Sequence, residues 1–317
     1  MAKSVSPRDI ETTRTNAMVV KQLDMTAGGG EAVHQMASAS REAQALWRQP
    51  CSTSLAQDRD TAVAWVMNDV AWALHDAGGD GRASVLWHYA AQAARDAHNW
   101  SLTTRIYGQI ARQRLQMRQP QQCLDLILLA AENDERQMLT ATELAMLWAL
   151  RARAHAAMAD AKGTDVAVHN ALSYWSKRKR SGDMDDRPWS GHFDEAHLYG
   201  DLAAAWSALL DHGARVATNA LGDYDHALAL QHPNNRRTRV LQELGRAHVD
   251  IKYGDLERGV MAAIRALDVG RVASSRVVAS FGRVSDAMLP FCARIDVRVT
   301  RDRIIETVGL REAVEQR

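Results

Sequence analysis

The chain has 317 residues, of which 46% are hydrophobic and 24% charged, and its 39 Lys and Arg residues nearly balance its 38 Asp and Glu residues. This composition excludes a disordered or collagen-like chain and a strongly basic nucleic-acid-binding domain. With only 19 glycines and 6 prolines, it also argues against an all-β fold, which needs many turns.

Cysteine use and hydropathy indicate the compartment. Cys51, Cys123 and Cys292 are odd in number and widely spaced, which excludes a disulfide framework and a Cys-x-x-Cys metal site. No apolar run approaches the roughly 18 residues of a membrane span. We therefore expect a cytoplasmic protein with reduced thiols that neither inserts into a membrane nor binds nucleic acid directly.

Breaker residues separate long periodic segments along the whole chain. They stand at Gly78-Gly79, Gln119-Pro120, Lys162-Gly163, His212-Gly213 and Tyr253-Gly254, at intervals of 41, 43, 50 and 41 residues. The long interval contains a polar insertion at 180–188. Each interval suits two helices of about four turns with their connections, so the spacing predicts helix-hairpin repeats.

The expected elements follow this spacing in chain order. Residues 1–50 are expected to form two helices separated by a turn at Gly28–Gly30, and 51–290 the repeat array, with a C-terminal cap or tail at 291–317. In 61–76 the residues Val63, Val66 and Val70 share one apolar helical face. The expected helix pairs are 61–76 with 82–97, 100–117 with 120–132, 140–160 with 164–178, 192–211 with 214–230 and 236–252 with 255–268, followed by 274–289 and a capping helix near 300–315.

One unit carries a recognisable repeat signature. Leu241–His248 followed by Gly254-Asp255-Leu256 resembles the tetratricopeptide repeat, with Ala262 and Ala266 where small residues pack and Gly259 where Ala is usual. The unit length near 41 exceeds the usual 34 residues, which marks a divergent form. The sequence therefore predicts an all-α, tetratricopeptide-repeat-like α-solenoid of about five to seven helix hairpins. A single packed helical bundle is the alternative architecture.

A broader resemblance covers nearly the whole chain. It is carried, in order, by Leu23-Asp24, Gly28–Gly30, Trp189, Phe193–Gly200, the unit just described and Ala273–Arg276. This succession is similar to the C-terminal repeat region of actinobacterial Xre-type helix-turn-helix transcription regulators. The resemblance implies a regulatory sensor array, here without a DNA-binding domain of its own. It implies no catalytic residues.

Tryptophan is over-represented among scarce aromatic residues, with nine of them beside six Tyr and three Phe. Trp65 and Trp72 lie seven residues apart on one helical face, with Asn68 and Asp69 between them. We interpret this stripe as a candidate ligand-facing wall of a concave groove. Packing between repeats is the alternative interpretation of both tryptophans.

Polar side chains extend this stripe onto the first helices of the next two hairpins. Spacings of 3, 4 and 7 place Arg105, Gln109 and Arg112 on one face, and Arg151 and His155 on another. If these faces line one groove, the guanidinium groups would bind a carboxylate or phosphate of a peptide or small ligand. A solvated surface is the alternative. The substitution Arg112→Glu tests the groove, because it should abolish binding of any partner found there.

Three other motifs suggest structural roles. His192 and His197 are five residues apart, which does not fit the spacing of a zinc protease, so we predict no metal and no cofactor. The basic run Lys177–Arg180 is interpreted as a solvated helix end, and Cys123 as a core residue. The C-terminal Pro290–Cys292 and Ile304-Ile305 could form either a cap or a homodimer contact.

These observations favour a non-enzymatic regulatory protein in bacterial transcriptional or signalling control. Its expected partners are a peptide, a small molecule or a protein bound in the concave groove, with a shift of conformational population as the response. A constitutive protein–protein interaction scaffold is the first alternative. A biosynthetic accessory protein or enzyme built on a helical array is the second.

Overall fold

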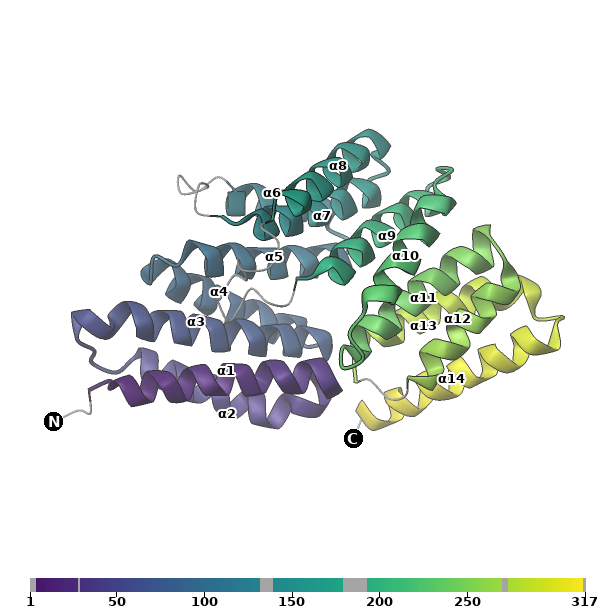
Figure 1. Cartoon of the computed structure of the whole chain (residues 1–317). Helices are drawn as coiled ribbons and strands as arrows, with labels where there is room; N and C mark the ends of the chain where they lie inside the picture. The colour runs from purple at the N-terminus through teal and green to yellow at the C-terminus, as the bar shows by residue number, and fades with distance from the viewer. Residues whose placement is uncertain (1–3, 28, 132–138, 179–192, 270–272, 316–317) are drawn as a thin grey trace. The chain divides into compact units, whose positions relative to one another are not determined.

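The computed structural model describes residues 4–27, 29–131, 139–178, 193–269 and 273–315, which form fourteen α-helices and a short 3-10 helix and contain no strand. This confirms the predicted all-α fold. Contacts divide the chain into two compact units, Met1–Asp194 and Glu195–Arg317 (Figure 1). The domain limits expected after residues 50 and 290 stay predictions. None of the described helices is both long and apolar enough to cross a bilayer.

The first unit consists of successive helix pairs. Each odd-numbered helix packs against the even-numbered helix that follows it, and α1, α3, α5 and α7 also pack against one another in sequence. This is the contact pattern of an α-solenoid. The helices are α1 (Pro7–Ala27), α2 (Gly29–Trp47), α3 (Thr53–Asp76), α4 (Asp80–Asp96), α5 (Trp100–Gln116), α6 (Pro120–Ala131), α7 (Ala141–Ala157) and α8 (Ala161–Lys177).

The second unit repeats the same pattern. Here α9, α11 and α13 pack against one another in sequence, and each also packs against the helix that follows it. The seven hairpins of the two units lie within the predicted range of five to seven. The helices are α9 (Glu195–Asp211), α10 (Ala217–Leu230), α11 (Arg236–Tyr253), α12 (Leu256–Asp268), α13 (Ser275–Met288), η2 (Leu289–Phe291) and α14 (Ile295–Glu315).

The turns inside the hairpins confirm the repeat length. In four of the hairpins, a residue with left-handed backbone lies in the turn between the two helices. These residues are Gly78 (φ 92°), Arg118 (φ 58°), Ala159 (φ 59°) and Gly213 (φ 90°). The first three positions are 40 and 41 residues apart, close to the interval read from the sequence. Arg118 and Ala159 adopt this conformation without being glycine, so the turn geometry is set by the helices that it joins.

Side-chain caps determine where several helices begin. Thr140 and Glu143 form a capping box at α7, in which the Glu143 amide donates to the Thr140 hydroxyl at 3.2 Å and the Thr140 amide donates to the Glu143 carboxylate at 2.8 Å. At α8 the Asp160 carboxylate accepts from the Gly163 amide at 2.8 Å. These caps satisfy amide groups that have no partner within the helix.

The core of the second unit is formed by helical stripes. On α11 the buried apolar residues recur at intervals of three and four, and they pack against small residues of α12 and against α13. Small side chains let α11 and α12 approach closely. The main contributors are Val240, Leu244, Ala247, Ile251, Val260, Ala263, Val277, Phe281 and Met288.

A polar clamp joins the end of α9 to the end of α11. The Asp211 carboxylate accepts from Lys252 Nζ at 2.8 Å and from the Tyr253 hydroxyl at 3.2 Å, and lies 3.3 Å from His248 Nε2. Hydrogen bonding from His248 and Lys252 holds the pKa of Asp211 well below its ordinary range. The clamp therefore fixes the registry of two successive hairpins.

Both chain ends differ in detail from the sequence prediction. Gly29 and Gly30 lie within α2, while Gly28 lies outside the described residues, so the predicted glycine turn is shorter than expected. The capping helix α14 begins at Ile295, five residues before the predicted start. Ile304 is buried and Ile305 is exposed. The proposed dimer contact at these residues stays a prediction.

Candidate functional site

The tryptophans singled out from the sequence lie in or beside the core of the first unit. Trp65 is 2% exposed and belongs to the hydrophobic core, whereas Trp72 is half-buried and packs edge-on against His75 with ring centroids 5.6 Å apart. On α5, Gln109 is buried and Arg112 is half-buried. Trp65 and Gln109 therefore offer little surface to a ligand in this conformation.

Asn68, Asp69 and Arg105 are brought together in a buried polar network. Trp87 Nε1 donates to Asn68 Oδ1 at 3.2 Å, Asn68 Nδ2 donates to Asp69 Oδ1 at 3.1 Å, and Arg105 Nη2 lies 3.5 Å from the same oxygen. Burial lowers the pKa of Arg105, and burial together with Arg105 lowers that of Lys21 on α1. The network links α3, α4 and α5.

Arg151 and His155 lie together at the end of α7. Arg151 Nε is 3.3 Å from His155 Nε2, and the guanidinium also lies over the Trp148 ring at 4.8 Å. His155 Nδ1 is 2.8 Å from the Asp160 carboxylate, so the histidine joins α7 to the cap of α8. The ligand role that the sequence suggested for these residues and for the buried network stays a prediction.

The other singled-out motifs are only partly described. Lys177 lies 5.0 Å over the Tyr174 ring and Arg178 lies 3.8 Å over the Trp175 ring, at the end of α8. The rest of the basic run and His192 lie outside the described residues. Cys123 is buried, as the sequence predicted. No cluster of three metal-ligating side chains occurs within the described part of the chain.

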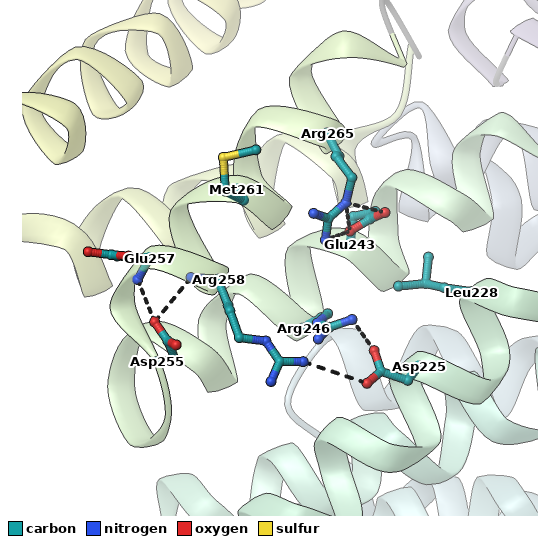
Figure 2. Close-up of a pocket in the computed structure, with 9 residues that line it drawn as sticks. All are labelled: Asp225, Leu228, Glu243, Arg246, Asp255, Glu257, Arg258, Met261 and Arg265. Atoms are coloured by element: carbon teal, nitrogen blue, oxygen red, sulfur yellow. Dashed lines mark hydrogen bonds and ion pairs between the residues drawn. The ribbon is translucent and has the colours of Figure 1, made fainter.

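A shallow hollow in the second unit lies at α10, α11 and α12. It has a volume of about 520 Å³ and is open to solvent (Figure 2). All three helices belong to the same compact unit. Its lining consists of Asp225, Leu228, Glu243, Arg246, Asp255, Glu257, Arg258, Met261 and Arg265.

Helical spacing places these side chains on facing stripes. On α12, Arg258, Met261 and Arg265 follow one another at i, i+3 and i+7, which is a single face of the helix. On α11, Glu243 and Arg246 are three residues apart and therefore also share a face. The opposite faces of α11 and α12 supply the apolar core, so the same two helices both build the unit and present the hollow.

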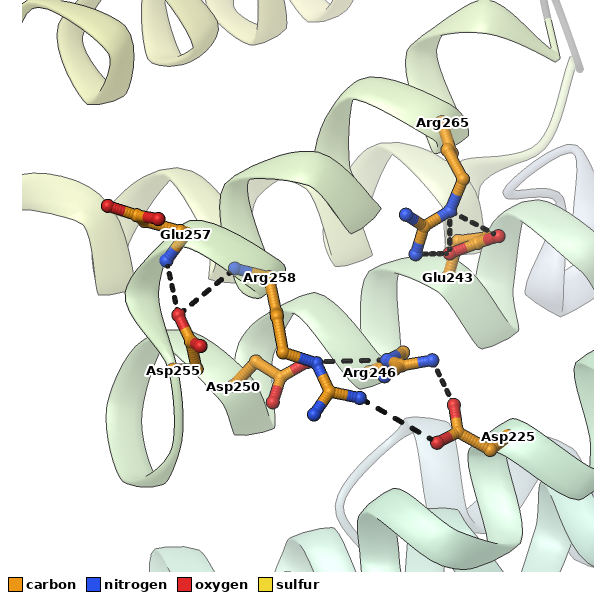
Figure 3. Close-up of polar contacts among 8 residues, drawn as sticks. All are labelled: Asp225, Glu243, Arg246, Asp250, Asp255, Glu257, Arg258 and Arg265. Carbon is orange, nitrogen blue, oxygen red and sulfur yellow. Dashed lines mark hydrogen bonds and ion pairs between the residues drawn. The ribbon is translucent and has the colours of Figure 1, made fainter.

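Two of the three arginines of the hollow are held by carboxylates. Arg265 donates hydrogen bonds to both oxygens of the buried Glu243 carboxylate (Figure 3). Its Nε lies 3.0 Å from Oε1 and 3.1 Å from Oε2, and its Nη2 lies 2.9 Å from Oε2. The hydrogen bonds that Arg265 donates to Glu243 raise the pKa of Arg265. Arg246 Nη1 donates to Asp225, and Arg246 Nε lies 3.3 Å from the buried Asp250 carboxylate. These pairs fix α10, α11 and α12 to one another.

Arg258 is the exception among the three. Its side chain is 58% exposed and its guanidinium makes one ion pair, from Nη2 to Asp225 Oδ2 at 4.0 Å, which is too long for a hydrogen bond. Its position is nevertheless fixed at the backbone, because Asp255 caps α12 by accepting from the amides of Glu257 at 2.9 Å and Arg258 at 3.3 Å. The cap thus fixes the Arg258 backbone at the start of α12, while the guanidinium extends from it into solvent beside the hollow.

Apolar surface also lies at the hollow. Met261, one helical turn after Arg258, is 53% exposed, and Leu228 of α10 is half-buried at the edge of the hollow (Figure 2). A flexible thioether adapts to ligands of different shape. The hollow therefore combines a cation, a carboxylate-rich rim and an adaptable apolar contact.

The sequence contained a signal for this site that we did not use. Arg258, Met261 and Arg265 share a helical face, and Glu243 and Arg246 show the same kind of spacing on the preceding helix. The candidate site residues suggested by the sequence lie on first helices of the hairpins, whereas α10 and α12 are second helices. The contribution of Asp225 requires the packing of α10 on α11, which no spacing within one helix reveals.

Comparisons with known proteins add little. No family model and no curated protein matches the chain. Among solved structures, it is similar to the crystal structure of BtubC (BKLC) from P. vanneervenii, with 15% sequence identity, coverage of 76% of this chain and 90% of that chain, and a TM-score of 0.49.

Proposed function

We propose that the protein is a non-catalytic binding protein whose hollow at α10, α11 and α12 captures a short segment of a peptide or partner protein. The observation that carries this proposal is the combination, within one compact unit, of the exposed guanidinium of Arg258 with exposed apolar surface at Met261. Binding surfaces in general combine apolar anchors with a few placed polar groups.

The chemistry of the lining also favours binding over catalysis. The nine lining residues are four carboxylates, three arginines, Leu228 and Met261. Carboxylates can act as nucleophiles or as general acids and bases, but here Glu243 is paired with Arg265 and Asp225 with Arg246. Arg265 and Arg246 are paired with carboxylates of the same unit. The third arginine, Arg258, is the one that can recognise a ligand by its charge and shape. A solenoid hairpin supplies such a surface.

A regulatory role in bacterial transcription or signalling is part of the proposal. It is supported by the resemblance of the sequence to the repeat region of Xre-type regulators, in which a helical array acts as sensor. The three free cysteines are compatible with a cytoplasmic location. Binding of a segment at the hollow would then alter the population of conformations that a second partner recognises.

Selection from a displayed random-peptide library on the purified full-length protein tests the proposal. We expect enriched peptides whose affinity, measured by fluorescence anisotropy, falls by about tenfold or more in Met261→Asp, because a buried charge would replace the apolar anchor. Val299→Asp is the matched control, since Val299 is 51% exposed on α14 and does not line the hollow. Failure to enrich any peptide, or equal affinity for wild type and Met261→Asp, would contradict the proposal.

A further inference from the structure

The helix α14 uses one of its faces to complete the core of the second unit. Val297, Ile304 and Val308 recur at helical intervals and pack into that core, where α14 contacts α12 and α13 (Figure 1). The sequence left open whether Ile304 and Ile305 form a cap or a contact with a second chain. The structure assigns Ile304 to the cap and leaves Ile305 exposed on the other side of the helix.

Two arginines set the rotation of α14 about its own axis. Arg301 Nε donates to the Ser285 carbonyl oxygen of α13 at 3.3 Å, and Arg303 Nη2 donates to the Asp268 carboxylate of α12 at 3.2 Å. These contacts lie on either side of the core-facing stripe. The opposite face of α14 is therefore presented to solvent in a defined orientation.

This outer face carries large aliphatic side chains. Ile295 is 69% exposed, Val299 is 51% exposed and Ile305 is 46% exposed. At about 100° per residue, the three lie within roughly a third of the helix circumference. Exposed aliphatic residues that gather on one helical face are typical of an interaction surface.

The charged residues of the same stripe change sign along the helix. Arg298 lies near the start, and Asp302 and Glu306 follow at i+4 and i+8, so all three share the outer face with the aliphatic residues. Their side chains are exposed and make no hydrogen bond or ion pair with other described residues. A stripe that is basic at one end and acidic at the other is complementary to an inverted copy of itself.

We propose that the outer face of α14 binds α14 of a second copy of this chain, in an antiparallel arrangement with a two-fold axis beside Val299. This register places Ile295 opposite Ile305 of the second copy and Arg298 opposite Asp302 of the second copy, and the symmetry repeats both contacts. Val299 meets its own counterpart near the axis. A parallel pairing would set Arg298 against Arg298 and Asp302 against Asp302, so the charges select the antiparallel one.

Sedimentation equilibrium of the full-length protein tests this pairing. One helix from each protomer forms a small interface, so we expect a dimer with a dissociation constant between about 10 and about 100 µM. Val299→Asp should make the protein monomeric over this range, because two carboxylates would meet at the axis. Val166→Asp is the matched control, since Val166 is 50% exposed on α8, and it should dimerise like wild type. The inference is independent of the hollow, because Val299→Asp is expected to keep peptide binding.

Exchanging the two charges tests the register. Arg298→Glu and Asp302→Arg should each weaken dimerisation by about fivefold or more, since either change turns two attractive pairs into repulsive ones. The double variant should recover the wild-type affinity. An equimolar mixture of the two single variants should also associate more tightly than either alone, which a helix weakened within one chain would not do.

Three results would overturn the inference. The first is a wild-type protein that stays monomeric up to about 500 µM, well above the expected dissociation constant. The second is a dimer that Val299→Asp leaves intact, because the contact would then lie elsewhere. The third is a double charge variant that dimerises no better than the single variants, which would exclude the antiparallel register.

Discussion

Asp223 shows how a single residue is tuned by its surroundings. Its carboxylate lies between α9 and α10, where Trp206 Nε1 donates to it at 2.9 Å. Burial raises the pKa of Asp223 to about 6, while the hydrogen bond from Trp206 and the proximity of His226 oppose the rise. The ordinary Asp value is 3.8, so the folded protein holds this proton over a pH range in which the unfolded chain has released it.

This difference predicts a pH-dependent stability. Because the folded-state pKa is the higher one, the contribution of Asp223 to the free energy of unfolding declines as pH rises from about 4 to about 6. Asp223→Asn removes the charged form but keeps an acceptor for Trp206. We expect it to raise the free energy of unfolding at pH 7 by about 1–2 kcal/mol, a value reduced for the partial exposure of the site.

Urea unfolding of wild type and Asp223→Asn, followed by circular dichroism at pH 4.5 and pH 7, measures this effect. The two proteins should converge in stability at the lower pH, since most of the Asp223 carboxyl is then protonated in the folded state. A stability difference that is the same at both pH values would show that the charge of Asp223 is not its cause.

Other residue-scale features were only partly readable from the sequence. Spacing along α3 put Asn68 and Asp69 between Trp65 and Trp72 on a candidate groove wall, and the sequence left open whether Trp65 faced a groove or packed between repeats. The structure places Trp65 in the core because α3 is packed on several sides, by α1, α2 and α4 among others. Helical periodicity indicates which residues share a face and cannot show how many neighbours cover it.

Gly259 reveals the close packing of two elements. A Cβ at this position on α12 would lie 2.6 Å from Ile251 Cγ1, 2.9 Å from the Ile251 backbone nitrogen and 3.1 Å from the Ala247 carbonyl oxygen of α11. Glycine therefore occurs where the related repeat usually has Ala because the two helices are in backbone contact at this point. This close contact between α11 and α12 also fixes the distance between the two helical faces that line the hollow.

We expect alanine substitutions at two helical glycines to have opposite effects on the free energy of unfolding. Gly259→Ala should lower the free energy of unfolding by about 1–3 kcal/mol, because the added methyl group forces α11 and α12 apart. Gly282→Ala on α13 meets nothing within 4 Å and should stabilise by up to about 1 kcal/mol through helix propensity. Thermal or urea unfolding of both variants provides the comparison. A stabilised Gly259→Ala protein would exclude the close contact.

At the scale of elements the sequence was most informative. The breaker spacing and the apolar periodicity predicted the five helix pairs from α3 to α12, since both depend on local chain properties. The helices α1 and α2 were expected outside the repeat array, and α14 was expected only as a cap. The remaining differences occur at the ends of elements. The start of α14 and the entry of Gly29 and Gly30 into α2 depend on packing against neighbouring helices, which overrides the local preference of glycine for turns.

At the scale of the whole molecule, two compact units share one repeat plan but differ in their polar features. The first unit buries Asp69 and Arg105, two of the charged residues that the sequence singled out, in an internal contact. The second unit presents charged residues at an open hollow, around Arg258. The candidate site could not be predicted from single-helix patterns because it needs three helices from two successive hairpins.

Hydrogen exchange of the full-length protein with a selected peptide tests most directly which surface binds. Binding at the hollow should slow amide exchange in Ala217–Leu230 and Leu256–Asp268 and leave Thr53–Asp76 and Trp100–Gln116 unchanged. The effect should be lost with Met261→Asp and kept with Val299→Asp. Slowed exchange confined to Thr53–Asp76 and Trp100–Gln116 would contradict the account and favour the groove that the tryptophan and arginine stripes suggested.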